Sequence, residues 1–245
     1  MRLAIIADIH GNLPALRAVL ADIERRHVDR IVNLGDCVSG PLWPRETMDS
    51  LEELELLTVR GNHDRWVAET PRSRMNASDA FAFDELSSSQ RTALGALPAQ
   101  CDVCEGVVAV HGTPVDDNQY LLEDILDARL VLAPPATIRG RLGCRAAGVV
   151  LCGHSHQPRI AQLAGEVLVV NPGSVGCPAY ADPTPPAHVS QSGSPHARYA
   201  LLSRGGGDWS VELIAIAYDC NAAAIRAAEN GRSDWAQALK TGFIA

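Results

Sequence analysis

The chain has 245 residues, of which 47% are hydrophobic and 20% are charged, and its formal net charge is −8. This composition is typical of a globular protein, so it excludes a disordered chain and predicts a single domain over residues 1–245. The acidic balance gives no general attraction to nucleic-acid phosphates, so nucleic acid is an unlikely partner. No segment approaches the roughly 18 consecutive apolar residues that span a bilayer, so we expect no membrane partner.

The N-terminal segment and the cysteines both indicate an intracellular setting. The apolar run Leu3–Ala7 is too short for a signal peptide and ends at an aspartate. The seven cysteines are odd in number and spread along the chain, unlike a disulfide framework, so we expect reduced thiols and a cytoplasmic protein. Cys101 and Cys104 form one CxxC pair without a second pair, which favours ordinary thiols near the start of a strand over half of a zinc site.

Eight short apolar segments predict buried strands. They are Leu3–Ala7, Ile31–Leu34, Leu56–Val59, Val107–Val110, Gly148–Leu151, Val167–Val170, Tyr199–Leu202 and Val211–Ile216.

Helices are predicted between several of these strands. Apolar residues at helical spacing predict a crossover helix over Leu13–Ile23, and Pro44 begins a second helix that we expect to reach Glu55. The first third of the chain therefore has the order β-α-β-α-β. Three further helices are predicted, over Ser87–Leu97, Leu121–Leu130 and Asn221–Asn230. Pro178–Arg198 holds five prolines and no period, which predicts a long surface loop.

Polar side chains follow six of the predicted strands at their carboxyl ends. In chain order they are Asp8 and His10, Asp36, Asn62 with His63 and Asp64, His111, His154 with His156, and Asn171. Ligand sites of layered α/β folds form at the carboxyl ends of strands, so we expect these side chains to converge. Five of the eight histidines lie in these turns, which favours a functional role for them.

The types and spacing of these residues predict a metal centre. In an extended segment residues i and i+2 point the same way, so Asp8 with His10, and His154 with His156, each direct two ligands to one place. Imidazole combined with carboxylate or amide oxygen favours transition-metal ions over Ca²⁺. The candidate ligands are Asp8, His10, Asp36, Asn62, His111, His154 and His156. Seven ligands are too many for one tetrahedral ion, but they suit two ions that share a carboxylate.

These motifs, in this order, resemble those of the calcineurin-like metallophosphoesterases, and within them the small prokaryotic phosphodiesterases. The matching segments are Asp8-Ile9-His10, Gly35-Asp36, Gly61-Asn62-His63-Asp64, His111-Gly112 and Gly153-His154-Ser155-His156, and they span roughly residues 3–176. The resemblance implies an α/β (α+β) fold, a four-layer α-β-β-α sandwich of two mixed sheets flanked by helices. It also implies that Asp8, His10 and His156 bind one ion, that Asn62, His111 and His154 bind the other, and that Asp36 bridges them.

The expected activity is hydrolysis of a small phosphodiester or phosphomonoester. Two divalent ions of the Mn, Fe, Ni or Zn type can share a water and lower its pKa, so that metal-bound hydroxide attacks the phosphate. His63 is not needed as a ligand, and the resemblance assigns it protonation of the leaving group or stabilisation of charge in the transition state. We expect the second catalytic candidate, Asp64, to accept a hydrogen bond from the His63 ring.

Two other classes of function compete with this interpretation. A non-catalytic metal-binding scaffold would keep the fold and bind a partner, but all seven ligands and His63 are present. A protein phosphatase or a nuclease would use the same fold, although the acidic balance disfavours a nuclease. We expect substrate choice to depend on Thr113–Ala147 and Pro178–Arg198, which flank the predicted site, and an oligomer is possible.

Overall fold

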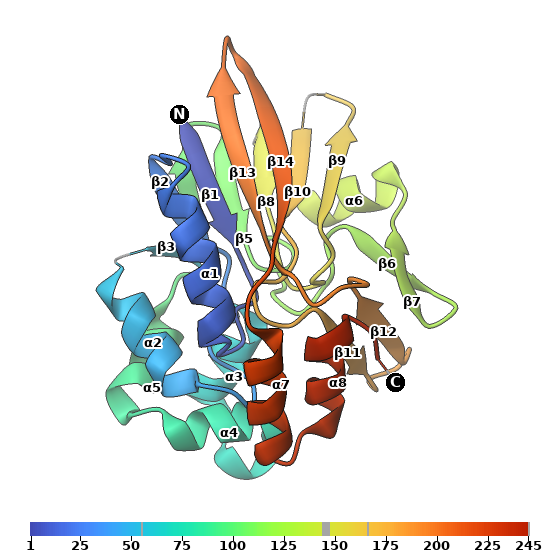
Figure 1. The fold of residues 1–245 in the computed structure, drawn as a ribbon. Helices are drawn as coiled ribbons and strands as arrows, with labels where there is room; N and C mark the ends of the chain where they lie inside the picture. The colour runs from blue at the N-terminus through green and yellow to red at the C-terminus, as the bar shows by residue number, and fades with distance from the viewer. Residues whose placement is uncertain (55, 144–147, 166, 245) are drawn as a thin grey trace.

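The computed structural model describes residues 1–54, 56–143, 148–165 and 167–244. Its centre is a pair of five-stranded mixed sheets (Figure 1). The first sheet has the order β14-β13-β1-β2-β3. Its strands are β1 (Arg2–Ile6), β2 (Arg30–Asn33), β3 (Leu57–Thr58), β13 (Ala197–Gly205) and β14 (Asp208–Ile216). β1, β2 and β3 are parallel, whereas β13 runs antiparallel to β1 and to β14.

The second sheet has the order β4-β5-β8-β10-β9. Its strands are β4 (Gln100–Cys104), β5 (Val107–Val110), β8 (Val149–Leu151), β9 (Arg159–Leu163) and β10 (Val167–Asn171). β5, β8 and β10 are parallel, and the two edge strands are antiparallel to them. All eight predicted strands are therefore confirmed, and β4 and β9 are additional.

Three buried apolar clusters show that the sandwich has four layers. Between the sheets, Ile5 of the first sheet packs in one cluster with Leu151 of the second. The other face of the first sheet is covered by α1 (Leu13–Glu24), and the other face of the second sheet by α6 (Pro135–Leu142). Because strands covered on both faces need apolar side chains on both, they appear in the sequence as continuous apolar runs. The predicted four-layer arrangement is confirmed.

The remaining helices lie at the end of the sandwich where β1 and β2 finish (Figure 1). They are α2 (Pro44–Glu53), α3 (Asn62–Glu69), α4 (Ala77–Glu85), α5 (Ser88–Ala96), α7 (Cys220–Glu229) and α8 (Ser233–Thr241). The helices predicted over Leu13–Ile23, from Pro44, over Ser87–Leu97 and over Asn221–Asn230 are confirmed, while Glu55 lies outside the described residues. No helix among the described residues is long and apolar enough to cross a bilayer.

A third, four-stranded sheet lies beside the sandwich, so the expectation of two sheets was incomplete. Its order is β11-β12-β7-β6, with β6 (Glu123–Leu126), β7 (Arg129–Leu132), β11 (Ala179–Asp182) and β12 (His188–Gln191). The helix predicted over Leu121–Leu130 is wrong, because this segment forms the hairpin of β6 and β7. The loop predicted over Pro178–Arg198 is wrong in part, because it contains β11 and β12.

The turn of this hairpin explains why a helix was predicted for the segment. Its two turn residues, Asp127 and Ala128, have left-handed φ values of 50° and 58°. Turns of this kind usually contain Asn-Gly or Asp-Gly, and without a glycine the segment carries no turn signal. In the segment Pro178–Arg198, β12 pairs with β11 on one side and with β7 on the other, and β7 lies more than fifty residues earlier in the chain. Local pattern does not predict that pairing.

Candidate metal centre

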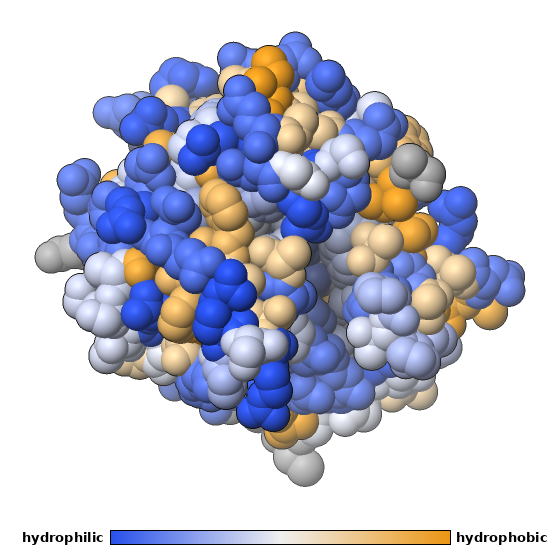
Figure 2. Space-filling model, turned by 90° about the horizontal axis from the view of Figure 1, so that it is seen from below, coloured by the Kyte–Doolittle hydropathy of each residue, from blue (hydrophilic) through white to orange (hydrophobic). Residues whose placement is uncertain are grey.

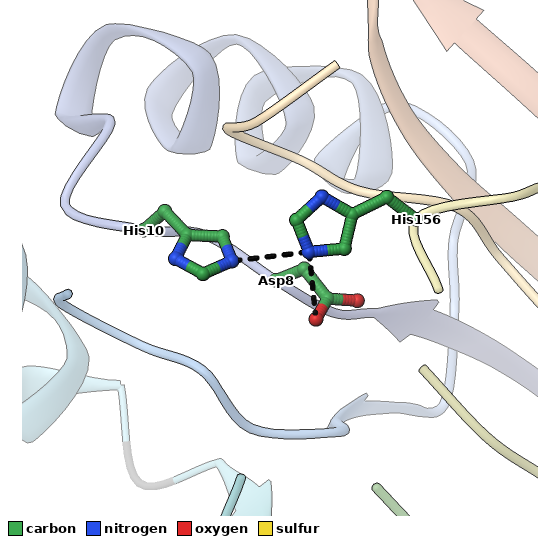
Figure 3. Close-up of side chains that lie close together, drawn as sticks. All are labelled: Asp8, His10 and His156. Carbon is green, nitrogen blue, oxygen red and sulfur yellow. Dashed lines mark hydrogen bonds and ion pairs between the residues drawn. The ribbon is translucent and has the colours of Figure 1, made fainter. Parts of the chain in front are cut away.

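All seven predicted ligands converge at one end of the sandwich. Two groups have ligand atoms that all lie within 4.8 Å of one another: Asp8, His10 and His156 form one, and Asp36, His111 and His154 the other. Figure 3 shows the first group, with His10 and Asp8 on the segment after β1 and His156 approaching from the segment after β8. Asn62 joins the second group, because its Oδ1 lies 2.9 Å from His111 Nε2.

Asp36 belongs to the second group and also faces the first. Its Oδ2 is 3.3 Å from His111 Nε2 and 3.9 Å from His10 Nε2, so one carboxylate oxygen faces a histidine of each group. Gly61 passes so close to this carboxylate that a Cβ atom there would collide with Asp36 Oδ1. A side chain at position 61 would therefore displace Asp36, which faces histidines of both groups.

Backbone carbonyls orient three of the imidazole rings. The Nδ1 atom of His10 lies 2.7 Å from Ser39 O, that of His111 2.7 Å from Leu34 O, and that of His156 2.8 Å from Cys177 O. Since a carbonyl oxygen only accepts hydrogen bonds, each Nδ1 carries the proton and donates. In each ring Nε2 is then turned towards the centre, which is the arrangement that a metal-binding histidine requires.

The donor set fits divalent metal ions. His10 Nε2 and His156 Nε2 face each other at 3.1 Å. Both rings already carry their proton on Nδ1, so in the neutral forms two lone pairs would point at each other. A positive charge between the rings, from a metal ion or a further proton, removes that repulsion. Two buried carboxylates, an amide oxygen and four imidazoles also match the ligand preferences of Mn, Fe, Ni and Zn.

The backbone at the ligands adopts an uncommon conformation. Asp8, His10, Asp36, His154 and His156 have left-handed φ values of 55°, 51°, 56°, 67° and 58°. Such a conformation costs a non-glycine residue about 1–2 kcal/mol. Two hydrogen bonds between neighbouring strand-end segments hold it in place, from Asp8 N to Gly35 O at 2.9 Å and from His10 N to Asp36 O at 3.0 Å.

Burial and opposite charges set the ionisation of the centre. Burial raises the pKa of Asp36, but the charges of His111 and His63 outweigh it, and the pKa lies well below its usual range. Burial lowers the pKa of His111, but Asp36 outweighs it and raises the pKa to about 9. Burial, with the charge of His111, lowers the pKa of His154 to about 3, which leaves a neutral ring, the form that binds metal.

His63 lies beside the ligands and is oriented by a residue that the sequence did not indicate. It is the second residue of α3, its side chain is 24% exposed, and its Nδ1 lies 2.6 Å from Asp79 Oδ1 of α4. Asp79 is buried, and its Oδ1 also accepts a hydrogen bond from Ser39 Oγ at 2.6 Å. Burial lowers the pKa of His63, but Asp36 and Asp79 outweigh it and raise the pKa to about 9.

The predicted hydrogen bond from the His63 ring to Asp64 is wrong. The Asp64 carboxylate instead accepts hydrogen bonds from the backbone N–H groups of Asp36 at 2.8 Å, Cys37 at 2.9 Å and Gly61 at 3.0 Å. The physical reason is that Asp64 stands in the first turn of α3, where a carboxylate turns back to the unpaired N–H groups near the helix start. Asp64 therefore shapes the turn that presents Asp36.

A cavity of about 410 Å³ lies over the two groups. Candidate ligands His10, Asp36, Asn62, His154 and His156 line it, together with His63, Trp66, Tyr120, Arg232 and Trp235. Arg232 and Trp235 belong to the C-terminal helical region, which the sequence did not connect with the site. Figure 2 shows the molecule from the end where β1 and β2 finish, with a hollow near the middle of that face.

A four-layer α/β sandwich with two such groups at its strand ends is the architecture of a candidate metalloenzyme. The model of the calcineurin-like phosphoesterase superfamily domain matches residues 1–190, and the chain belongs to this superfamily. The resemblance inferred from the motifs is thus confirmed. Members of the family bind divalent metals, and membership of the superfamily suggests a phosphoester hydrolase.

Individual relatives extend this likeness over nearly the whole chain. An uncharacterized protein of Methanocaldococcus jannaschii, MJ0912, is 26% identical over 95% of this chain and 94% of its own length. A metallophosphoesterase from Sphaerobacter thermophilus is 23% identical, with a TM-score of 0.74 over 99% of each chain. The hypothetical protein PH1004 from Pyrococcus horikoshii OT3 is 21% identical, with a TM-score of 0.79 over 100% of this chain and 99% of its own. At 23% and 21% identity, these two structures establish the fold of the chain and nothing about its activity.

Proposed function

We propose that the protein is a phosphoesterase that uses two divalent transition-metal ions to hydrolyse a small phosphodiester or phosphomonoester. The observation that carries the proposal is the place of Asp36, whose Oδ2 faces His111 at 3.3 Å and His10 at 3.9 Å. A buried carboxylate between two sets of imidazoles is what a pair of ions sharing one ligand requires. A site for a single ion would not need a carboxylate in that position.

The same geometry supports the division of ligands between the two ions. Asp8, His10 and His156 would bind one ion, Asn62, His111 and His154 the other, and Asp36 both. When bound, two such ions supply an activated water and neutralise the charge on the phosphate. The donor set admits Mn, Fe, Ni or Zn.

His63 is the residue that we assign to the leaving group. Its Nδ1 is held by Asp79, so Nε2 is left for the substrate in the cavity. With a pKa of about 9 the ring is protonated at neutral pH, and it can donate a proton to the departing alkoxide or stabilise negative charge on the phosphate. We assign Asp64 a positioning role, because its carboxylate binds the backbone of the turn that presents Asp36.

The alternatives are a non-catalytic metal-binding scaffold and a protein phosphatase or nuclease on the same fold. A cavity of about 410 Å³ suits a small ester better than a protein segment or a nucleic-acid strand. A cytoplasmic location and self-association stay predictions.

The test is to strip the protein with a chelator and reload it separately with Mn²⁺, Ni²⁺, Zn²⁺ or Mg²⁺. Turnover of nitrophenyl phosphate monoester and diester is then measured side by side. We expect metal-dependent hydrolysis of at least one ester. His63→Ala should keep its bound metal and lose about 100-fold or more in kcat, whereas His196→Ala, outside the cavity, should match the parent protein. Tight metal binding without turnover on either ester would support the scaffold instead.

A further inference from the structure

A second cavity, of about 960 Å³, lies next to the cavity over the metal centre. The two share part of their walls, and the common residues are Asn118, Tyr120, His154, Asp182 and Thr184. Because His154 is also a candidate ligand, the second cavity adjoins the candidate metal centre. Volumes of several hundred Å³ are typical of small-molecule sites.

Tyr120 forms the shared wall and is held firmly. Its ring stacks on the His154 ring with a centroid distance of 4.8 Å. Its hydroxyl lies 2.7 Å from both the Tyr180 hydroxyl and His188 Nε2. His188 Nδ1 donates to Pro186 O at 2.9 Å, so Nε2 accepts from Tyr120, which accepts in turn from Tyr180. Since Tyr180 lies on β11 and His188 on β12, the third sheet fixes the wall.

The lining of the second cavity is partly apolar. Ile125, Val131, Pro134 and Pro185 contribute apolar surface, and all four lie on or beside the strands of the third sheet. Such a surface binds methylene groups or rings of an ester substituent by removing them from water.

The charges of the second cavity disfavour an anionic group. Asp182 forms no ion pair with an arginine or lysine in the described parts of the chain, and its carboxylate accepts a backbone hydrogen bond from Thr184 at 2.8 Å. Asp116, whose charge acts on Arg65 outside this cavity, accepts a backbone hydrogen bond from Asn118 at 2.9 Å. Arg141 is the one cation among the described lining residues, and Asp124 binds it at 2.6 Å. A second phosphate would be repelled by the Asp116 and Asp182 carboxylates, and the described lining residues offer it no unpaired cation.

We propose that this second cavity binds the second ester group of a phosphodiester, and that this group is sizeable, partly apolar and free of negative charge. The inference rests on the proposed function, because a phosphate at the metal centre must present one ester group towards Tyr120. It narrows the substrate class to diesters of an uncharged or cationic alcohol and disfavours nucleoside polyphosphates.

The test compares three nitrophenyl diesters on the metal-loaded protein, with methyl, pentyl or carboxybutyl as the second ester group. Methyl and pentyl differ in size, while pentyl and carboxybutyl differ mainly in charge. We expect kcat/KM for the pentyl ester to exceed the methyl value by about tenfold or more, because each buried methylene contributes. The carboxybutyl ester should fall about tenfold below the pentyl ester at low salt.

Two variants place the effect in the second cavity. Thr184→Trp, at the junction of the two cavities, should lower the pentyl-to-methyl ratio towards one. Its control is Thr92→Trp on the exposed side of α5, which should keep the parent ratio. Asp182→Asn should raise the carboxybutyl-to-pentyl ratio several-fold, whereas Asp102→Asn on β4 should not.

The outcomes separate the two proposals. Metal-dependent turnover with equal kcat/KM for methyl and pentyl esters, or for pentyl and carboxybutyl esters, would overturn this inference and leave the phosphoesterase proposal intact. Ratios that change equally in Thr184→Trp and Thr92→Trp would also overturn it. Absence of turnover of every ester by metal-loaded protein would overturn the proposed function, and this inference with it.

Discussion

The two-sheet sandwich and the third sheet are built from different kinds of strand. In the sandwich, every residue of β5 and of β8 is buried, since each strand is covered on both faces. In the third sheet, β7 begins and ends with exposed residues, and Leu126 at the end of β6 is 59% exposed. The sandwich carries the candidate ligands at its strand ends, while the third sheet forms a wall of the cavities. Buried strands thus position the candidate ligands, and partly exposed strands shape the cavities beside them.

The largest expected effect concerns the residue between the two groups of ligands. Asp36→Asn should lower metal content and turnover together, the latter by about 100- to 1,000-fold, because the shared ligand loses its charge. Metal per chain is measured by elemental analysis, beside kcat for a nitrophenyl ester. Asp102→Asn on β4 is the control. Full activity and metal content in the Asp36 variant would remove this residue from the mechanism.

The contrast between the sandwich and the third sheet can be tested by measuring the free energy of unfolding of a variant in each. Leu151→Ala on β8, in the core between the sheets, should lower the free energy of unfolding by about 3 kcal/mol. Leu126→Ala on β6 should lower it by less than about 0.5 kcal/mol, because the side chain is 59% exposed. Urea denaturation of both variants measures the difference. Similar losses would show that the third sheet supports the fold as much as the sandwich does.

A smaller effect is expected when the Asp79 carboxylate, which contacts His63, is replaced. Asp79→Asn should reduce kcat by about 10- to 100-fold while metal content stays unchanged, because the ring loses its charged partner. The loss should be greater for esters with poor leaving groups, which need the proton most. Asp84→Asn, exposed on the same helix, is the matched control. A uniform loss across all leaving groups would contradict a role in proton donation.

The last expected effect lies in the sandwich, away from the candidate ligands. Asp22 on α1 accepts hydrogen bonds from Tyr199 of β13 and from Arg26, both at 2.6 Å. Burial raises the pKa of Asp22, but these bonds outweigh it and the pKa is lowered. A lowered folded-state pKa means that this stabilisation is present above the unfolded value of about 3.9 and is lost as the pH falls through the folded value.

Asp22→Asn should therefore reduce stability by about 2 kcal/mol at neutral pH. The gap to the parent protein should close as the solution is acidified below about pH 3.9. Urea denaturation over a pH series measures this, with Asp29→Asn, exposed at the edge of β2, as the control. A gap that does not change with pH would show that lost packing, and not the charge of Asp22, causes the effect.

The sequence was sufficient to predict the sandwich and the convergence of the ligands. The convergence follows from apolar runs that end in Asp, His and Asn, because the ends of parallel strands meet at one edge. The sandwich was expected from the resemblance of the motifs to those of the calcineurin-like metallophosphoesterases. The role of Asp79 was beyond sequence reasoning, since its contact with His63 depends on how α4 packs against α3. The third sheet was missed because a turn without glycine and a pairing between distant segments carry no local signal.

The left-handed backbone of five candidate ligand positions has a consequence for laboratory evolution. Glycine adopts this conformation without the steric cost that other residues bear. At His154, with φ of 67°, the ring forms no hydrogen bond with the described residues, so there only its ring contacts oppose such a change. A screen for heat resistance in the presence of a chelator would thus enrich glycine there, and the same screen with divalent metal added would retain histidine. The presence of chelator or of metal during selection would therefore decide whether the most heat-resistant variants keep their activity.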